Sequence, residues 1–189
     1  MKPRVLGRSL MAAALLVSAG VTGAATRQGA VAVAGDEGIA RSVRHEILMY
    51  PYYSIWDDVS FRVVNGSVEL FGAVNQPFKK QDIEKRVQKI PGVTSVTDEI
   101  KVLPLSNEDD RLRLQVARAI YGDPRFARYA IQAVPPIHIL VENGHVTLEG
   151  VVNNELEKQV AGMRAASAGL SFGPVDNHLQ VENPPARKG

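Results

Sequence analysis

The chain carries the same eleven-residue pattern twice, and this repetition constrains its fold more than any other feature. The pattern N-G-x-V-x-L-x-G-x-V-N begins at Asn65 and begins again at Asn143. Self-similarity at a fixed spacing is the signature of an architecture assembled from copies of one small unit. We therefore expect two similar modules in tandem, an arrangement that favours a binding function over catalysis.

Each copy of the pattern predicts a β-hairpin. Asn-Gly pairs favour type I′ turns, because these turns need positive φ at both central residues. A two-residue turn then pairs Phe61 with Leu70 in the first copy and Ile139 with Leu148 in the second. The second glycine of each pattern is expected where a helix lies close to the sheet. The residues given these turn and packing roles are Asn65, Gly66, Gly72, Asn143, Gly144 and Gly150.

Apolar residues at helical spacing precede and follow each hairpin and predict two helices per copy. We expect Asp36 and Asn75 to cap the helices of the first copy, with Ser106 or Asn107 and then Asn153 or Asn154 in the second. The apolar stripes are Ile39, Val43 and Ile47, then Phe78, Ile83, Val87 and Ile90, and in the second copy Leu112, Val116, Ala119 and Ile120, then Leu156, Val160, Met163 and Ala166.

A last strand closes each copy, so the predicted order is α-β-β-α-β. The expected fold class is α+β: two tandem modules, each a small three-stranded sheet with two helices packed on one face. The predicted boundaries are 39–103 for the first module, 104–109 for a linker, 110–182 for the second module and 183–189 for a disordered tail.

The segment 1–25 has the features of a signal peptide. Lys2, Arg4 and Arg8 precede an uncharged apolar stretch, and small residues suited to cleavage follow, ending at residue 25 or as late as residue 34. An uncleaved anchor is the alternative, although the stretch is rich in Ala and Gly and barely long enough to span a bilayer. The chain has no Cys, which excludes disulfides and a lipid-modified N-terminal cysteine. We therefore expect a periplasmic or exported protein that is soluble after cleavage.

The charge balance excludes one class of partner. The chain has 22 basic and 20 acidic side chains, and removing the three basic residues of the signal segment leaves 19 against 20. Because the basic and acidic side chains are nearly equal in number, the charge gives no reason to expect binding of nucleic acid.

The two copies together resemble the BON domain of bacterial envelope proteins. After the hairpin pattern and a helix, the first copy ends in G-V-x-x-V-x-D-x-I-x-V from Gly92 to Val102. The second copy keeps the matching residues Val175, Asn177, Leu179 and Val181. A signal peptide followed by two such units is similar to the osmotically inducible periplasmic proteins. The resemblance implies a non-enzymatic protein and an association with anionic phospholipid, osmotic stress, envelope integrity and chaperone-like activity.

Residues 50–56 hold three of the five tyrosines and the only tryptophan, and form the first candidate contact surface. Aromatic rings with a polar edge suit a membrane interface, which makes Tyr50, Tyr52 and Trp56 candidate lipid or partner residues. The alternative is that Tyr53 and Trp56 complete the core of a small domain.

Two basic stretches form the second candidate surface. An anionic membrane would attract them, whereas the alternative is a charged helix face that is only solvated. They consist of Lys79, Lys80, Lys85, Arg86 and Lys89 after the first hairpin, and of Arg111, Arg113, Arg118, Arg125 and Arg128 near the first helix of the second copy.

Metal and catalytic sites are not expected. His138 and His145 share a hairpin face with Glu142 and Glu149, but the register sets each His opposite a Glu, which is ordinary cross-strand pairing. No nucleophile, phosphate-binding loop or cofactor motif is present. The leading hypothesis is a peripheral envelope protein that binds anionic phospholipid. The alternatives are a periplasmic chaperone or protein-interaction module, and more weakly an accessory domain of a secretion or peptidoglycan-associated assembly.

Overall fold

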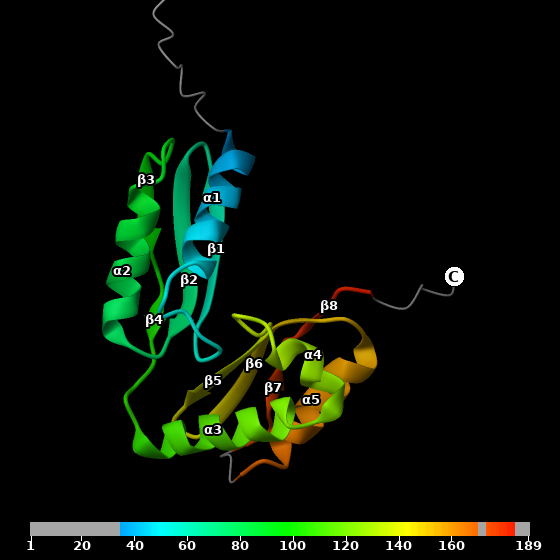
Figure 1. The fold of residues 1–189 in the computed structure, drawn as a ribbon. Helices are drawn as coiled ribbons and strands as arrows, with labels where there is room; N and C mark the ends of the chain where they lie inside the picture. The colour runs from blue at the N-terminus through cyan, green and yellow to red at the C-terminus, as the bar shows by residue number, and fades with distance from the viewer. Residues whose placement is uncertain (1–34, 170–172, 184–189) are drawn as a thin grey trace, which may run out of the picture. The chain divides into compact units, whose positions relative to one another are not determined.

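The computed structural model of the chain describes residues 35–169 and 173–183 (Figure 1). The predicted signal peptide and most of the predicted tail lie outside these residues. Both modules belong to one compact unit, and each has the order α-β-β-α-β. The prediction of two tandem α+β modules is confirmed.

The first module places its middle strand between the other two. Strand β2 pairs antiparallel with β1 and parallel with both β3 and β4, so the helix between β2 and β3 is a crossover. The elements are α1 (Asp36–Leu48), β1 (Asp58–Val64), β2 (Ser67–Val74), α2 (Pro77–Gln88), β3 (Ser95–Asp98) and β4 (Lys101–Val102).

The second module repeats this topology and adds two short helices before its first strand. Strand β6 lies between β5 on one side and β7 and β8 on the other. The elements are α3 (Asn107–Tyr121), η1 (Pro124–Phe126), α4 (Ala127–Ala130), β5 (Ile137–Glu142), β6 (His145–Val152), α5 (Glu155–Ala166), β7 (Asp176–Asn177) and β8 (Gln180–Val181). Because α3 starts at Asn107, the segment between the modules without regular structure is only residues 103–106, shorter than expected.

The third strand of each module is broken at the same place. Between β3 and β4 the Asp98 carboxylate accepts a hydrogen bond from the Ile100 amide at 3.0 Å, and Asn177 does the same for Leu179 at 3.3 Å. This local bond turns Ile100 and Leu179 inward, where each is 1% exposed. The predicted third strand is therefore two short strands around a side-chain-supported bend.

Both hairpins have the predicted register and turn. Phe61 pairs with Leu70 and Ile139 with Leu148, and all four Asn-Gly turn residues have positive φ. The reason given for the second glycine was wrong. A Cβ on Gly72 would lie 2.2 Å from the Asp58 carbonyl oxygen, so the neighbouring strand rather than a helix requires glycine there. Gly150 has the same relation to the edge of β5, where it meets the Pro136 carbonyl oxygen.

An aspartate in the first turn of each module's first helix holds the hairpin turn. Asp36 is not the N-cap of α1, which is Gly35; its carboxylate instead accepts from the amides of Asn65 at 2.8 Å and Gly66 at 2.9 Å. In the second module Asp109 accepts from Asn143 at 2.9 Å and Gly144 at 2.7 Å. The same contact thus joins helix and turn in both copies.

The other predicted caps divide between the two modules. Ser106 and Asn154 cap α3 and α5 as expected, with their side chains accepting from backbone amides at 3.2 and 3.0 Å. Asn75 does not cap α2, because Gln76 occupies that position and the Asn75 side chain accepts from Lys79.

Each module has its own hydrophobic core between its sheet and its helix pair. Val43 of α1 and Val87 of α2 are fully buried against Val68 and Leu70 of β2. The prediction of an apolar stripe was wrong for four residues: Phe78, Leu156 and Met163 are 46%, 61% and 62% exposed, and Ala166 is exposed as well.

Candidate functional site

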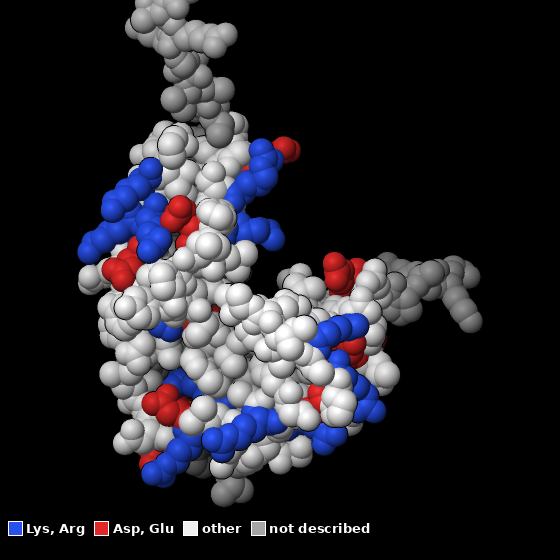
Figure 2. All heavy atoms as spheres, viewed as in Figure 1, with Lys and Arg blue, Asp and Glu red and all other residues white. Residues whose placement is uncertain are grey.

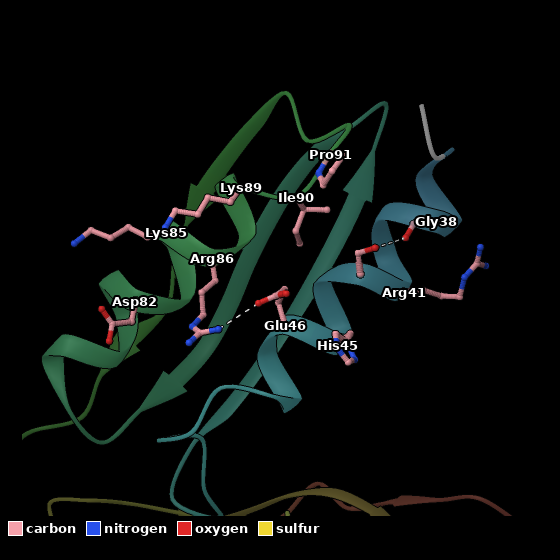
Figure 3. Close-up of a pocket in the computed structure, with 11 residues that line it drawn as sticks. Gly38, Arg41, His45, Glu46, Asp82, Lys85, Arg86, Lys89, Ile90 and Pro91 are labelled. Atoms are coloured by element: carbon pink, nitrogen blue, oxygen red, sulfur yellow. Dashed lines mark hydrogen bonds and ion pairs between the residues drawn. The ribbon is translucent and has the colours of Figure 1, made fainter. Parts of the chain in front are cut away.

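The main candidate site is a hollow of about 960 Å³ between the two helices of the first module, here called the α1–α2 groove (Figure 3). Arg41 and His45 line it from α1, and Lys85 and Arg86 line it from α2, with Lys89 directly after that helix. Three lysines and arginines predicted from the sequence, Lys85, Arg86 and Lys89, therefore meet at one surface. Figure 2 shows Lys and Arg side chains gathered over α2.

Most of the positive charge in this groove is uncompensated. The side chains of Arg41, Lys85 and Lys89 are exposed and have no hydrogen-bond or ion-pair partner among the described residues. Only Arg86 is paired, with Glu46 at 3.3 Å across the groove. An anion entering here would meet free cations without first displacing a carboxylate from each of them.

Tyr50 is buried and contacts two residues that line the groove, Asp82 and Arg86. It is 4% exposed, its hydroxyl donates to Asp82 at 2.8 Å, and Arg86 stacks over its ring at 5.1 Å. Burial, and then the hydrogen bond to Asp82, raise the pKa of Tyr50, so the phenol stays neutral. The expectation of a surface role for Tyr50 was wrong.

The other two aromatic candidates differ from each other. Tyr52 is 61% exposed, with its ring edge-on to Phe78 at 5.5 Å. Trp56 is half-buried, and together with Ile55 packs against the core of the second module. The packing alternative therefore describes Trp56, whereas Tyr52 and Phe78 remain available for contact.

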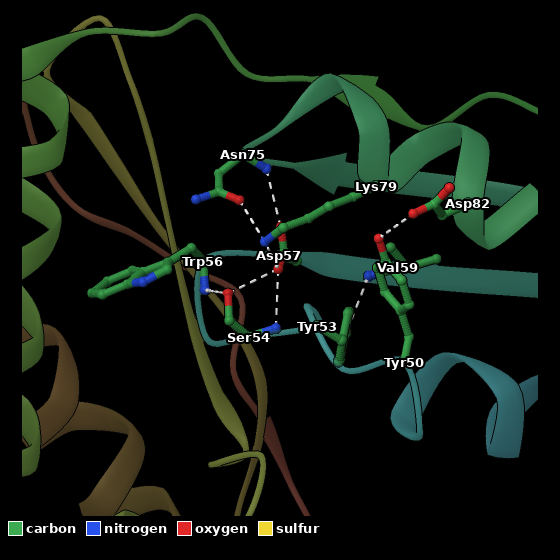
Figure 4. Close-up of polar contacts among 9 residues, drawn as sticks. All are labelled: Tyr50, Tyr53, Ser54, Trp56, Asp57, Val59, Asn75, Lys79 and Asp82. Carbon is green, nitrogen blue, oxygen red and sulfur yellow. Dashed lines mark hydrogen bonds and ion pairs between the residues drawn. The ribbon is translucent and has the colours of Figure 1, made fainter.

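Lys79 and Lys80 do not contribute free charge to the surface. Lys79 is 5% exposed and donates to the buried Asp57 carboxylate at 2.7 Å (Figure 4), so its prediction as a surface residue was wrong. Asp57 also accepts from the Ser54 amide and hydroxyl and from the Asn75 amide. Lys80 donates to the Ile100 carbonyl at 2.7 Å. Both lysines hold α2 on its own module.

The arginines of the second module are dispersed. Arg125 pairs with Asp123 at 3.2 Å and Arg128 with Glu157 at 2.6 Å, whereas Arg111 and Arg118 are exposed without a partner among the described residues. Arg113 is buried, and one of its guanidinium nitrogens donates to the Val141 carbonyl at 2.6 Å. The structure therefore does not gather this stretch into one site.

Sequence reasoning missed Arg41 and His45 of α1. Their spacing of four residues places them on one side of a helix, and this signal was present in the sequence. What the sequence did not reveal is that these two residues line the same hollow as Lys85, Arg86 and Lys89.

The histidines do not form a metal site within the described residues, where no group of three or more metal-ligating side chains occurs. The cross-strand pairs are as predicted, with His138 opposite Glu149 and Glu142 opposite His145. His178, which the sequence did not place there, contacts Glu149 at 2.7 Å.

Comparison with known proteins finds distant similarity among solved structures. No curated protein matches the chain. Among solved structures, the chain is similar to the C-terminal domain of CdsD, a structural protein of the type III secretion system of Chlamydia trachomatis, with 18% identity and a TM-score of 0.30. That match covers 75% of this chain and 63% of the other. A second CdsD structure matches with 18% identity and a TM-score of 0.27, over 78% of this chain and 93% of the other.

The family comparison is more specific. The model of the BON domain matches the chain twice in tandem, over residues 35–104 and 108–183, which together make up most of its length. BON domains are phospholipid-binding-type domains of the cell envelope and are generally non-catalytic. With both of its modules matched, this chain belongs to the BON-domain family.

Proposed function

We propose that the protein is a peripheral binder of anionic phospholipid in the bacterial envelope, and that the α1–α2 groove of the first module supplies the electrostatic contact. The observation that carries the proposal is the set of exposed and unpaired cations, Arg41, Lys85 and Lys89, around one hollow. Each basic residue near an anionic membrane surface contributes about 1 kcal/mol. Three such residues acting together favour a surface-bound state without any deep insertion.

The helix pair of the second module offers complementary chemistry at equivalent positions. Leu114 and Met163 occupy the places of Arg41 and Lys85, and they are 48% and 62% exposed. Exposed apolar side chains on a helix suit the boundary between headgroups and acyl chains. One module thus provides charge and the other provides apolar contacts.

The proposed location is the periplasmic side of the envelope, and it rests on the signal-peptide pattern of the segment 1–25. No helix among the described residues is long and apolar enough to cross a membrane. The proposed attachment is therefore peripheral and reversible.

Flotation with vesicles tests the proposal. The chain lacking the segment 1–25 should float with vesicles containing phosphatidylglycerol and not with phosphatidylcholine vesicles, and raising the salt from low to physiological should reduce the bound fraction, because exposed charge contacts are screened. Reversing two groove charges with Lys85→Glu and Lys89→Glu should weaken binding by roughly tenfold or more.

The matched control is Arg111→Glu with Arg118→Glu, which changes the net charge equally but at two dispersed, unpaired arginines of the second module. The α1–α2 groove predicts a smaller loss for this control than for the lysine pair. Equal losses would show that net charge alone attracts the protein, and no flotation of the parent chain under any condition would disprove lipid binding.

A further inference from the structure

The outer edge of β1 carries a row of backbone groups without partners. In a two-residue hairpin the closing pair, Val64 and Ser67, is hydrogen-bonded, and the bonding alternates along the strand. Val59, Phe61 and Val63 therefore turn their amides and carbonyls away from β2. The amide of Val59 confirms this orientation, because it donates outward to the Tyr53 hydroxyl at 3.4 Å. The outward groups of Phe61 and Val63 have no partner among the described residues.

The same edge of the second module is covered by two side chains of α3. The Tyr121 hydroxyl donates to the Ile137 carbonyl at 2.6 Å and accepts from the Ile137 amide at 3.2 Å. Arg113 donates to the Val141 carbonyl at 2.6 Å. Ile139 and Val141 are 0% exposed, whereas their counterparts Phe61 and Val63 in the first module are half-buried.

The first helix of the first module has Ala40 and Leu48 where α3 has Arg113 and Tyr121. The alignment follows from Asp36 and Asp109, which make the same turn contacts. Neither Ala40 nor Leu48 has a polar side chain to reach the strand, and a groove of about 770 Å³ remains between α1 and β1. All the residues that line this groove except Gln180 belong to the first module.

The lining indicates what would fill the space. Ile47, Leu48, Tyr53 and Phe61 provide an apolar floor, with Leu48 48% exposed. Arg41 and Arg44 stand along the helix side, exposed and unpaired within the described residues. Free amides and carbonyls on a strand edge, apolar walls and cations together suit an extended peptide that carries an acidic residue.

In the second module a backbone carbonyl from a turn outside the sheet already uses such an edge. The Ile139 amide on β5 donates to the Ile55 carbonyl at 2.7 Å, and Ile55 and Trp56 pack against the adjoining core. Phe61 is the position in β1 that corresponds to Ile139, and its amide is unpaired within the described part of the chain.

We propose that the groove between α1 and β1 of the first module binds an extended, acidic and apolar segment of another polypeptide by adding it as a strand to β1. This proposal shares Arg41 with the lipid-binding proposal but needs neither Lys85 nor Lys89, so changes at these two lysines distinguish the two proposals.

Selection of random hexapeptides displayed on phage against the full-length chain tests the proposal. Enriched peptides should combine Asp or Glu with apolar residues, and their binding should protect the amides of Phe61 and Val63 from hydrogen exchange. The double change Ala40→Arg with Leu48→Tyr installs the covering residues of the second module and should lower peptide affinity at least tenfold. Arg41→Glu with Arg44→Glu should do the same while leaving the strand edge open.

Lys85→Glu with Lys89→Glu is the matched control and should leave peptide affinity unchanged. The proposal is overturned if no peptide is enriched, or if enriched peptides bind the Ala40→Arg, Leu48→Tyr variant as well as the parent. It is also overturned if sedimentation shows that the parent chain dimerises and this variant does not, since the occupant would then be a second copy. Unfolding curves of each variant check that the fold is retained.

Discussion

The two modules share one backbone plan but stabilise it with opposite polar chemistry. Lys79 and Glu157 occupy equivalent positions near the start of the second helix of each module, with the same separation as the turn residues Asn65 and Asn143. Lys79 reaches a buried Asp57 in the preceding loop, whereas Glu157 binds Arg128 and the Tyr129 hydroxyl. The second helix thus contributes the cation of the ion pair in the first module and the anion in the second. In both modules the pair connects that helix to the segment before the first strand of the module. At this position the repeat therefore preserves the connection between elements and not the residues that make it.

A second joint shows the same exchange. At the end of the first helix, Tyr50 packs under Arg86 in the first module, and Asp123 accepts from Arg164 at 2.8 Å in the second. One arginine position is common to both, and its partner is a ring in one copy and a carboxylate in the other.

The largest expected effect comes from removing Lys79, the cation of the ion pair in the first module. Lys79→Met leaves the Asp57 carboxylate buried without its cation, and we expect a loss of about 3 kcal/mol in the free energy of unfolding. Glu157→Gln should cost less, about 1–2 kcal/mol, because Arg128 is half-exposed and water can replace the lost acceptor. Urea unfolding of the two variants measures the difference. A cost for Glu157→Gln equal to that of Lys79→Met would show that burial does not separate the two joints.

The shared aspartates should also differ in strength. Asp109→Ala leaves two turn amides without an acceptor at a site where the carboxylate is 2% exposed, and we expect a loss of about 2–3 kcal/mol. Asp36 is more exposed, so Asp36→Ala should cost about 1 kcal/mol. Urea unfolding again provides the comparison, with Glu108→Ala as the control on the exposed side of the same helical turn. Equal losses in the free energy of unfolding for Asp36→Ala and Asp109→Ala would contradict the prediction that the buried aspartate contributes more.

These joints mark the limit of what the sequence could predict. Local patterns determine the helices, hairpin register and positive-φ turns, because each depends on residues within a few positions of one another. The contact of Asp36 with Asn65 joins residues 29 positions apart, and a carboxylate before a helix looks the same in sequence whether it caps that helix or reaches a distant turn. The burial of Lys79 depends on Asp57 in the same way. Basic composition pointed to α2, but only packing shows which of its lysines are unpaired.

The pH dependence of the second module should follow Asp123. Its backbone hydrogen bond from Arg125, together with Arg164, holds the pKa of the Asp123 carboxyl below its usual value. The ionised Asp123 carboxylate therefore stabilises the folded state fully above the unfolded-state pKa of about 3.9. This stabilisation is lost as the pH falls through the lower folded-state pKa. Melting curves of the parent and Asp123→Asn should differ at pH 7 and converge in strong acid. A constant difference across that range would contradict the assignment.

The variant with the smallest expected effect on stability tests whether the charged helix pair of the first module and the apolar helix pair of the second differ in membrane binding. Leu114→Arg with Met163→Lys gives the second module the residues that line the α1–α2 groove at equivalent positions. Both side chains are exposed, so the free energy of unfolding should change by no more than about 0.5 kcal/mol.

If exposed charge on the helix pair is what attracts anionic vesicles, this variant should float with them more strongly at low salt, and Arg41→Leu with Lys85→Met should float more weakly. If apolar contact from the second module dominates instead, the first variant should lose binding despite its added charge, and vesicle flotation with and without added salt distinguishes the two results.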